Sequence, residues 1–315
     1  MDLRLRTMAA MQEGVFTFEE ATRLGLTGND LTALVRSGQV TRLRHRAYVL
    51  SDVYAAASPD AQYRLRVHAV LRSRPPRPRG LPDRASHHSA LALHGISFFK
   101  APRDVVVVES QSGPQAVRGG MRLLSQSDAD TYRYGDVRLV GAEAACVQVA
   151  ARDGFEAGVC AMDSALHLGK CTIEGLAAAV ELVPAARRRR VRAAVEAADA
   201  RSESIGESRT RIILLDAGFA VIPQFEVREG RTLLGRVDFL VDGCVVVEFD
   251  GLMKYEGIEG KVAIGADKDR EKRIRRLGYE FVRIVWRELD DPVSIARHVA
   301  EAKRDAQRRS VLAVR

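Results

Sequence analysis

The chain has 315 residues, of which 46% are hydrophobic and 29% are charged. This length allows about two to three domains, and the apolar content excludes a chain dominated by disorder. A net charge of +8 favours a polyanionic partner but also suits an ordinary basic protein. Because the sequence has no bilayer-spanning apolar run and no signal peptide, we expect a cytoplasmic protein without a membrane partner. The four cysteines lack Cys-x-x-Cys spacing, which argues against zinc.

Two capped segments near the N-terminus predict a helix-turn-helix. Thr17 and Glu20 have the spacing of a capping box, and Thr27 can cap a second short helix. After Gly38, basic and apolar residues alternate along VTRLRHRAYVL, residues 40–50. Such a segment can form a small hairpin beside the two helices. The pattern therefore predicts a winged helix.

The predicted winged helix, residues 1–52, carries basic side chains that could contact phosphate groups of DNA. We assign this role to Arg36, Arg42, Arg44 and Arg46. The alternative is a winged helix used for protein contacts or for packing on the rest of the chain. The pattern resembles the N-terminal domain of AbiEi-like antitoxins and transcriptional regulators, although Ala47 stands where a glycine before the tyrosine is common.

Residues 53–200 are expected to form a mixed α/β middle region. Helical patterns cover about Tyr63–Arg72 and Cys160–Leu168, and Val105–Val108 forms a short apolar strand. The stretches HHSALALHGI and DSALHLG resemble the middle region that follows the winged helix in AbiEi-like proteins. This resemblance implies an architecture rather than an activity.

A hairpin near residues 237–250, VDFLVDGCVVVEFD, places Asp238, Glu248 and Asp250 among apolar residues. Strand alternation keeps the acids of each strand on one face. A two-residue loop would put Asp238 and Glu248 on opposite faces, so a shared site requires an odd loop, for example three residues with Gly243 at positive φ. Clustered carboxylates need a compensating cation. The three acids therefore predict a Mg²⁺ or Mn²⁺ site.

Charged residues on both sides of the hairpin extend this prediction. Upstream, Glu207 lies near the start of a capped helix. Downstream, basic residues that could position a nucleophile or hold phosphate are Lys254, Lys268, Lys272 and Arg275. A strand near residues 279–286 then contains Arg283, which would need an anion nearby.

The order of these features over residues 201–315 resembles the PD-(D/E)XK nuclease superfamily, in particular its branch similar to very-short-patch-repair endonucleases. The resemblance implies a restriction-endonuclease-like mixed sheet flanked by helices. It also implies site residues: the acids Glu207, Asp238 and Glu248, the lysines Lys254 or Lys268, and the supporting Gln224. The usual Glu-x-Lys reads Glu248-Phe249-Asp250 here, so the lysine would have moved along the chain.

The whole chain is thus predicted to be a multi-domain α/β protein, similar to actinobacterial proteins that pair an AbiEi-like region with a nuclease-like domain. Our first reading is a Mg²⁺- or Mn²⁺-dependent DNA endonuclease or nickase, targeted or regulated by its winged helix. The alternative is a non-catalytic DNA-binding regulator or antitoxin-like protein with a degenerate nuclease domain. In that case Glu248 and Asp250 would pair with Arg236, Arg270 or Arg283. The sequence leaves open whether the chain forms a homo-oligomer.

Overall fold

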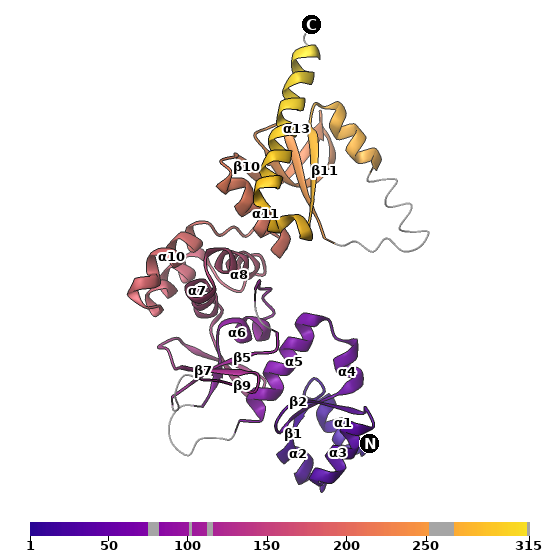
Figure 1. Cartoon of the computed structure of the whole chain (residues 1–315), viewed down its shortest axis with the longest axis vertical. Helices are drawn as coiled ribbons and strands as arrows, with labels where there is room; N and C mark the ends of the chain where they lie inside the picture. Colours follow the sequence, from indigo (N-terminus) through magenta and orange to yellow (C-terminus); the bar gives the residue numbers. More distant parts are fainter. Residues whose placement is uncertain (75–81, 101–102, 112–115, 252–267, 314–315) are drawn as a thin grey trace. The chain divides into compact units, whose positions relative to one another are not determined.

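The computed structural model describes residues 1–74, 82–100, 103–111, 116–251 and 268–313. The chain divides into two compact units, Met1–Ala198 and Asp199–Arg315 (Figure 1). The first unit contains a three-stranded and a six-stranded sheet, and the second contains a four-stranded sheet. The predicted α/β class is confirmed. The predicted boundary at residue 52 stays a prediction, because residues on both sides belong to the first unit.

The first unit begins with short helices around the three-stranded sheet. In chain order these elements are α1 (Leu3–Ala10), β1 (Val15–Thr17), α2 (Phe18–Arg23), α3 (Gly28–Arg36), β2 (Val40–Arg44) and β3 (Ala47–Leu50). The strand order is β1-β3-β2, and both pairings are antiparallel. The helices α2 and α3 are followed by the hairpin of β2 and β3, which is the order predicted for a winged helix.

Local sequence explains why α2 and α3 begin where they do. The Thr17 side chain accepts a hydrogen bond from the backbone N–H of Glu20, and the Glu20 side chain accepts one from Thr17. Thr27 and Asp30 form the same reciprocal pair at the start of α3. Both predicted caps are confirmed, and each satisfies backbone donors that a helix start leaves unpaired.

The rest of the first unit combines the six-stranded sheet with a layer of helices. Its elements are α4 (Ser51–Ala56), α5 (Pro59–Arg72), β4 (Arg84–Ala85), α6 (His87–His94), β5 (Val106–Ser110), β6 (Ala116–Arg118), β7 (Met121–Ser125), β8 (Thr131–Tyr134), β9 (Val137–Val140), α7 (Ala142–Asp153), α8 (Phe155–His167), α9 (Ile173–Ala179), the 3-10 turn η1 (Val180–Leu182) and α10 (Ala185–Glu196). The strand order is β6-β7-β5-β4-β9-β8. Arg84 and Glu109, on neighbouring strands, form a fully buried ion pair at 2.7 Å.

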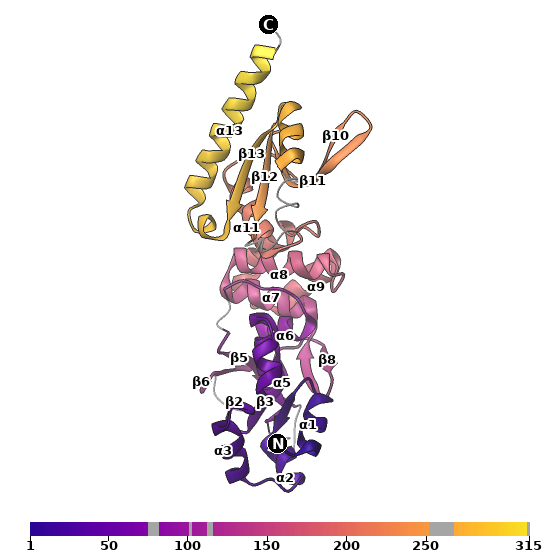
Figure 2. The ribbon, with the colours of Figure 1, turned by 90° about the vertical axis from the view of Figure 1, so that its right-hand side faces the viewer.

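The second unit is a four-stranded mixed sheet with helices on both faces. Its elements are α11 (Ile205–Asp216), β10 (Val221–Glu229), β11 (Thr232–Val241), β12 (Val245–Asp250), a helix of which residues 268–276 are described, β13 (Glu280–Val285), the 3-10 turn η2 (Trp286–Asp290) and α13 (Pro292–Ala313). The strand order is β10-β11-β12-β13, and β12 and β13 are parallel. Helix α13 runs along the sheet (Figure 2).

Two apolar clusters hold these helices to the sheet. Val247 packs with Leu214 of α11 and Val299 of α13, whereas Val246 packs with Ile274 of the helix at 268–276. Since Val246 and Val247 are adjacent on β12, the two clusters lie on opposite faces. The acids at the even-numbered positions of β12, Glu248 and Asp250, therefore share a face with the helix at 268–276.

Candidate functional site

The hairpin of β11 and β12 has the register that a shared acidic site requires. Val241 pairs with Val245, which leaves a three-residue loop with Gly243 at φ 72°. The predicted odd loop is confirmed. Pairing of the two strands ends at Phe239 and Val247. Val237 packs in the apolar cluster of Val246 and Ile274, so the alternation of side chains along β11 is interrupted at Asp238.

Asp238 lies in a crowded, partly desolvated environment. Burial first, and then the nearby carboxylates of Glu207, Glu248 and Glu203, together raise the pKa of Asp238 to about 7, against a hydrogen bond from the Phe249 backbone that lowers it. That bond joins Phe249 N to Asp238 Oδ2 at 2.8 Å. The acids predicted from the two strands and from α11 are therefore close enough to influence one another.

Glu207 is fixed by the start of α11. Ser204 caps this helix, and its hydroxyl donates to Glu207 Oε1 at 2.7 Å. Glu207 Oε2 accepts from the backbone of Glu203 and from Gln224 Nε2, each at 3.0 Å. Gln224 adopts a left-handed φ of 53°, which only a few non-glycine residues do. Protein donors thus satisfy the Glu207 carboxylate, and the predicted supporting residue Gln224 is one of them.

Arginines contact the remaining acids. Arg270 Nη2 lies 2.8 Å from Glu248 Oε1, and Arg283, beside Glu248 on β13, lies 3.6 Å from both Glu248 and Asp250. Arg283 also lies 3.1 Å from Glu271 Oε2. This is the arrangement expected for the arginine-paired alternative. Among the described residues, no group of three or more His, Cys, Asp and Glu side chains is placed to hold a metal ion. The metal site stays a prediction.

Close packing between the start of α11 and strand β12 positions the acids. This contact was not predicted from the sequence. A Cβ added at Gly206 would lie 2.0 Å from Phe249 Cε1, so the start of α11 fits directly against the strand that carries Glu248. The Phe249 ring also meets Trp286 edge to face, with ring centroids 5.1 Å apart. A glycine one residue before the helix glutamate was the signal that could have revealed this contact.

The predicted basic stripe is only partly available to phosphate. Lys268 is exposed at the start of the described helix, and Lys272 lies 3.1 Å from Asp269. Arg275 is 2.9 Å from Glu271 and stacks over Phe281. Lys254, the other predicted nucleophile-positioning lysine, lies outside the described residues.

In the first unit, α3 presents a polar face. Leu31 is buried in the core of the three-stranded sheet, whereas the exposed positions include Asn29, Thr32, Ala33 and Arg36. These four positions have the i, i+3, i+4, i+7 spacing of a single helix face. Sequence reasoning nominated Arg36 but missed Asn29 and Thr32, although the period set by Leu31 could have identified them.

The three predicted wing arginines have different environments. Arg42 is exposed, with a 3.3 Å hydrogen bond to His45 Nδ1. Arg44 is half-buried and donates to the carbonyl of Gly119 at 3.1 Å, and burial lowers its pKa. Arg46 forms an ion pair with Glu19 and lies over the Phe18 ring. Arg36, Arg42 and Arg46 are therefore the exposed arginines of the predicted set, and of these Arg46 already pairs with Glu19.

Comparison with known families found a match for the N-terminal segment. Residues 4–51 match a family model described as transcriptional regulator, AbiEi antitoxin. The matched segment covers nearly all of α1 to β3, so the predicted N-terminal resemblance is confirmed. No curated protein matches the chain, and the nuclease resemblance over residues 201–315 finds no support in these comparisons. No helix in the described part of the chain has both the length and the apolar character needed to cross a membrane.

Proposed function

We propose that this protein is a DNA-binding transcriptional regulator or antitoxin of the AbiEi type. The observation that carries the proposal is the match of residues 4–51 to that family, over a segment with two capped helices and a hairpin. In helix-turn-helix proteins the second helix enters the major groove and its N-terminal residues contact base edges. In this chain that helix is α3.

The exposed face of α3 offers suitable groups for this role. Asn29 lies in its first turn, where an amide can form paired hydrogen bonds with adenine. Arg36 lies in the last turn and can reach phosphate or guanine. Arg42, on the hairpin, adds a phosphate contact beside the helix. The nearby acid Glu19 is neutralised by Arg46, which reduces repulsion of the DNA backbone.

The test is DNA binding by the full chain. Duplexes enriched from a random pool serve as ligands, and fluorescence anisotropy gives affinity as a function of salt. We expect the R36A/R42A double variant to weaken binding and to lower the salt slope by about 2, close to one unit for each phosphate contact removed. Asn29→Ala should mainly reduce discrimination between sequences, since it removes a contact to a base.

Arg297→Ala is the matched control, because this exposed arginine belongs to the second unit and lies outside the segment that matches the family. It should change the salt slope less than Arg42→Ala does. An unchanged affinity and salt slope in the R36A/R42A variant would show that this surface does not contact DNA. The winged helix would then serve protein contacts.

A metal-dependent DNA endonuclease or nickase is our second candidate. One observation favours it: burial, together with the nearby carboxylates of Glu207 and Glu248, raises the pKa of Asp238 to about 7, and a bound cation would stabilise the ionised acid. Asp238, Glu248 and Asp250 would hold Mg²⁺ or Mn²⁺, which would activate water and neutralise the phosphate. Arg270 would have to leave Glu248 first, because the two now form an ion pair.

Cleavage assays separate the two candidates. Single- and double-stranded DNA is incubated with the wild type and with Glu248→Gln in Mg²⁺ or Mn²⁺, and calorimetry measures Mn²⁺ binding. The nuclease candidate predicts cleavage and Mn²⁺ binding that the substitution abolishes. DNA binding without cleavage and without Mn²⁺ binding would leave the regulator as the function.

A further inference from the structure

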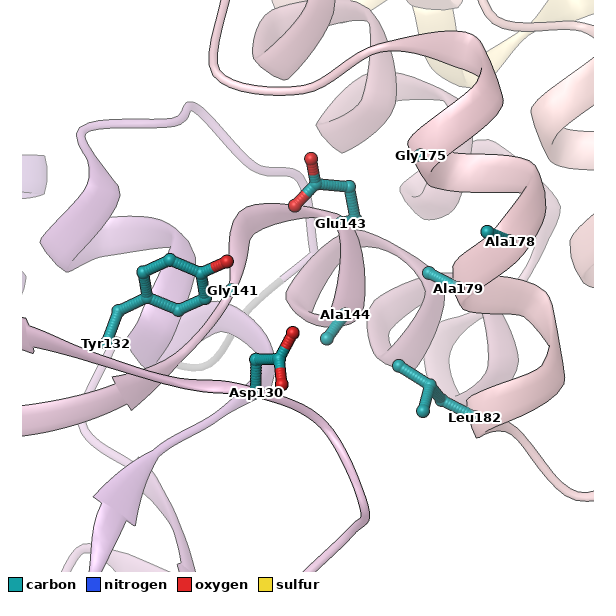
Figure 3. Close-up of a pocket in the computed structure, with 9 residues that line it drawn as sticks. All are labelled: Asp130, Tyr132, Gly141, Glu143, Ala144, Gly175, Ala178, Ala179 and Leu182. Carbon is teal, nitrogen blue, oxygen red and sulfur yellow. The ribbon is translucent and has the colours of Figure 1, made fainter.

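A pocket of about 340 Å³ opens in the first unit between β8, the start of α7 and α9 (Figure 3). Figure 3 shows the carboxylates of Asp130 and Glu143 and the ring of Tyr132 around this space, with α9 forming the opposite wall. The remaining wall consists mainly of glycine and alanine. The volume is at the lower end of the range for small-molecule sites.

No basic side chain of the described residues pairs with the two carboxylates of this pocket, of which Asp130 is exposed and Glu143 is half-buried. Within the part of the chain that the structure describes, neither Asp130 nor Glu143 forms an ion pair or a hydrogen bond through its side chain. Glu143 occupies the first turn of α7, where the helix dipole favours negative charge. Tyr132 is 51% exposed, so its ring face is available. The pocket is therefore anionic and has an aromatic wall, although the chain as a whole carries a charge of +8.

Two glycines keep space around Glu143. A Cβ at Gly175, inside α9, would lie 3.2 Å from Glu143 Oε1, and a Cβ at Gly141 would lie 2.9 Å from Tyr132 Cε2. Glycine lowers the stability of a helix interior relative to alanine. Its presence in α9 allows the helix to approach the carboxylate closely and leaves the pocket open.

We propose that this pocket binds a small organic cation, an amine or guanidinium compound, and that the bound cation acts on the winged helix. The charged group would lie between Asp130 and Glu143, and the Tyr132 ring would stack on the cation or its apolar part. Carboxylates that form no ion pair in the described part of the chain can recognise a positive group, and α9 limits the size of that group on one side of the pocket. The regulatory part of this inference rests on the proposed function.

Strand β8 joins the pocket to the winged helix. Tyr132 and Tyr134 are two residues apart on β8, so both side chains lie on the same face. Tyr132 lines the pocket, and the Tyr134 hydroxyl donates to Glu13, just before β1. A ligand that moves Tyr132 therefore acts on a strand that is bonded directly to the N-terminal segment.

A second connection follows from the turn after β8. Asp136 lies 2.6 Å from Arg72 Nη1, and another nitrogen of Arg72 pairs with Glu20. The other oxygen of Glu20 accepts the 2.8 Å hydrogen bond from Thr17 that caps α2. Arg72 is only 9% exposed, so this link is shielded from solvent. The cap of the first helix in the helix-turn-helix is thus tied to the strand that lines the pocket.

Calorimetry on the full chain tests the site, with agmatine and spermidine as probes and pentanol as an uncharged control. We expect saturable binding of at least one cation, no binding of pentanol, and at least a tenfold loss of affinity in Glu143→Gln and in Asp130→Asn. Glu174→Gln is the matched control, since Glu174 lies beside Gly175 but does not line the pocket. Binding that is absent, or equal in all three variants, would overturn the site.

Hydrogen exchange measures the action on the winged helix without requiring DNA. We expect the bound cation to change the protection of peptides covering residues 13–23 in the wild type, and to change it less in Tyr134→Phe, which lacks the hydroxyl bonded to Glu13. Cation binding without any change in these peptides would overturn the regulatory role. A change in exchange in a protein that binds no DNA would instead contradict the proposed function and leave this link in place.

Discussion

Two groups of carboxylates, one on the hairpin of the second unit and one in the pocket of the first unit, have different surroundings. In the second unit, Glu248 is paired with Arg270 and Asp250 lies near Arg283. In the first unit, the pocket acids Asp130 and Glu143 face open space. Acids that meet arginines within the same chain stabilise the fold, whereas acids left without a partner are available to a ligand. A cation from outside the chain is therefore expected at the pocket acids rather than at Glu248 and Asp250.

The largest difference in stability is expected between alanine substitutions at two glycines that lie beside these acids, Gly206 and Gly175. Gly206→Ala should destabilise the second unit by about 2–3 kcal/mol, because its Cβ would overlap Phe249. The single tryptophan, Trp286, packs on Phe249, so its fluorescence during urea unfolding reports on this unit. Gly175→Ala, followed by circular dichroism, should change stability by less than about 1 kcal/mol, since helix propensity offsets a milder contact. Equal effects would show that the two sites are packed alike.

The next contrast concerns a paired acid. Glu248→Gln should destabilise the second unit by about 2 kcal/mol, because Arg270 would lose a charged partner at 2.8 Å in a partly buried setting. Urea unfolding followed by Trp286 fluorescence measures the change. A stabilised variant would mean that repulsion among the acids exceeds their attraction to arginine, and the metal-site candidate would gain.

Local patterns allowed part of this architecture to be predicted. Alternation of acids in VDFLVDGCVVVEFD required an odd loop, and Thr17 and Thr27 marked both helix starts, because capping and strand parity depend on neighbours in the sequence. The partners of the charges could not be predicted in the same way. Arg270 reaches Glu248 only because a helix crosses the sheet, and any of several arginines could have filled that role. The nuclease resemblance rested on the acids, whose pairing is decided by this non-local packing.

The positions of the pocket acids could be predicted from local sequence patterns even less than the partners of the hairpin acids. Asp130 and Glu143 belong to no motif, and they come together because β8 and α7 are adjacent to α9 in the folded unit. The strand β1 was also missed, since its three residues form a strand only by pairing with β3. Short segments take their conformation from tertiary contacts rather than from intrinsic propensity.

A smaller effect on the free energy of unfolding is expected at Asp238 of the second unit. Its pKa is raised by burial and by nearby carboxylates. The pKa in the folded state, about 7, exceeds the ordinary value of 3.8, so the folded state binds the proton more tightly. The contribution of Asp238 to the free energy of unfolding should therefore be fully present below about pH 4 and be lost as the pH rises through about 7. Asp238→Asn should remove this loss and stabilise the protein by about 1 kcal/mol at pH 8. Urea unfolding at several pH values measures the change.

If wild type and Asp238→Asn show the same pH profile, the crowding of acids at the hairpin is not felt by Asp238. Repeating the measurement at pH 8 with Mn²⁺ sharpens the result. A cation bound among the acids would stabilise the wild type more than the variant. Equal responses would favour the arginine-paired arrangement.

The smallest effect is expected for the pocket acids, which form no ion pair in the described part of the chain. The double variant Asp130→Asn with Glu143→Gln should leave the free energy of unfolding within about 0.5 kcal/mol of the wild type, because no ion pair is broken and some like-charge repulsion is removed. Thermal melts at low and high salt measure this change, and added salt should benefit the wild type slightly more, since it screens the repulsion. A loss above about 1 kcal/mol would mean that these carboxylates stabilise the first unit itself. The contrast with Glu248 would then disappear, and with it the reason to expect a cation in the pocket.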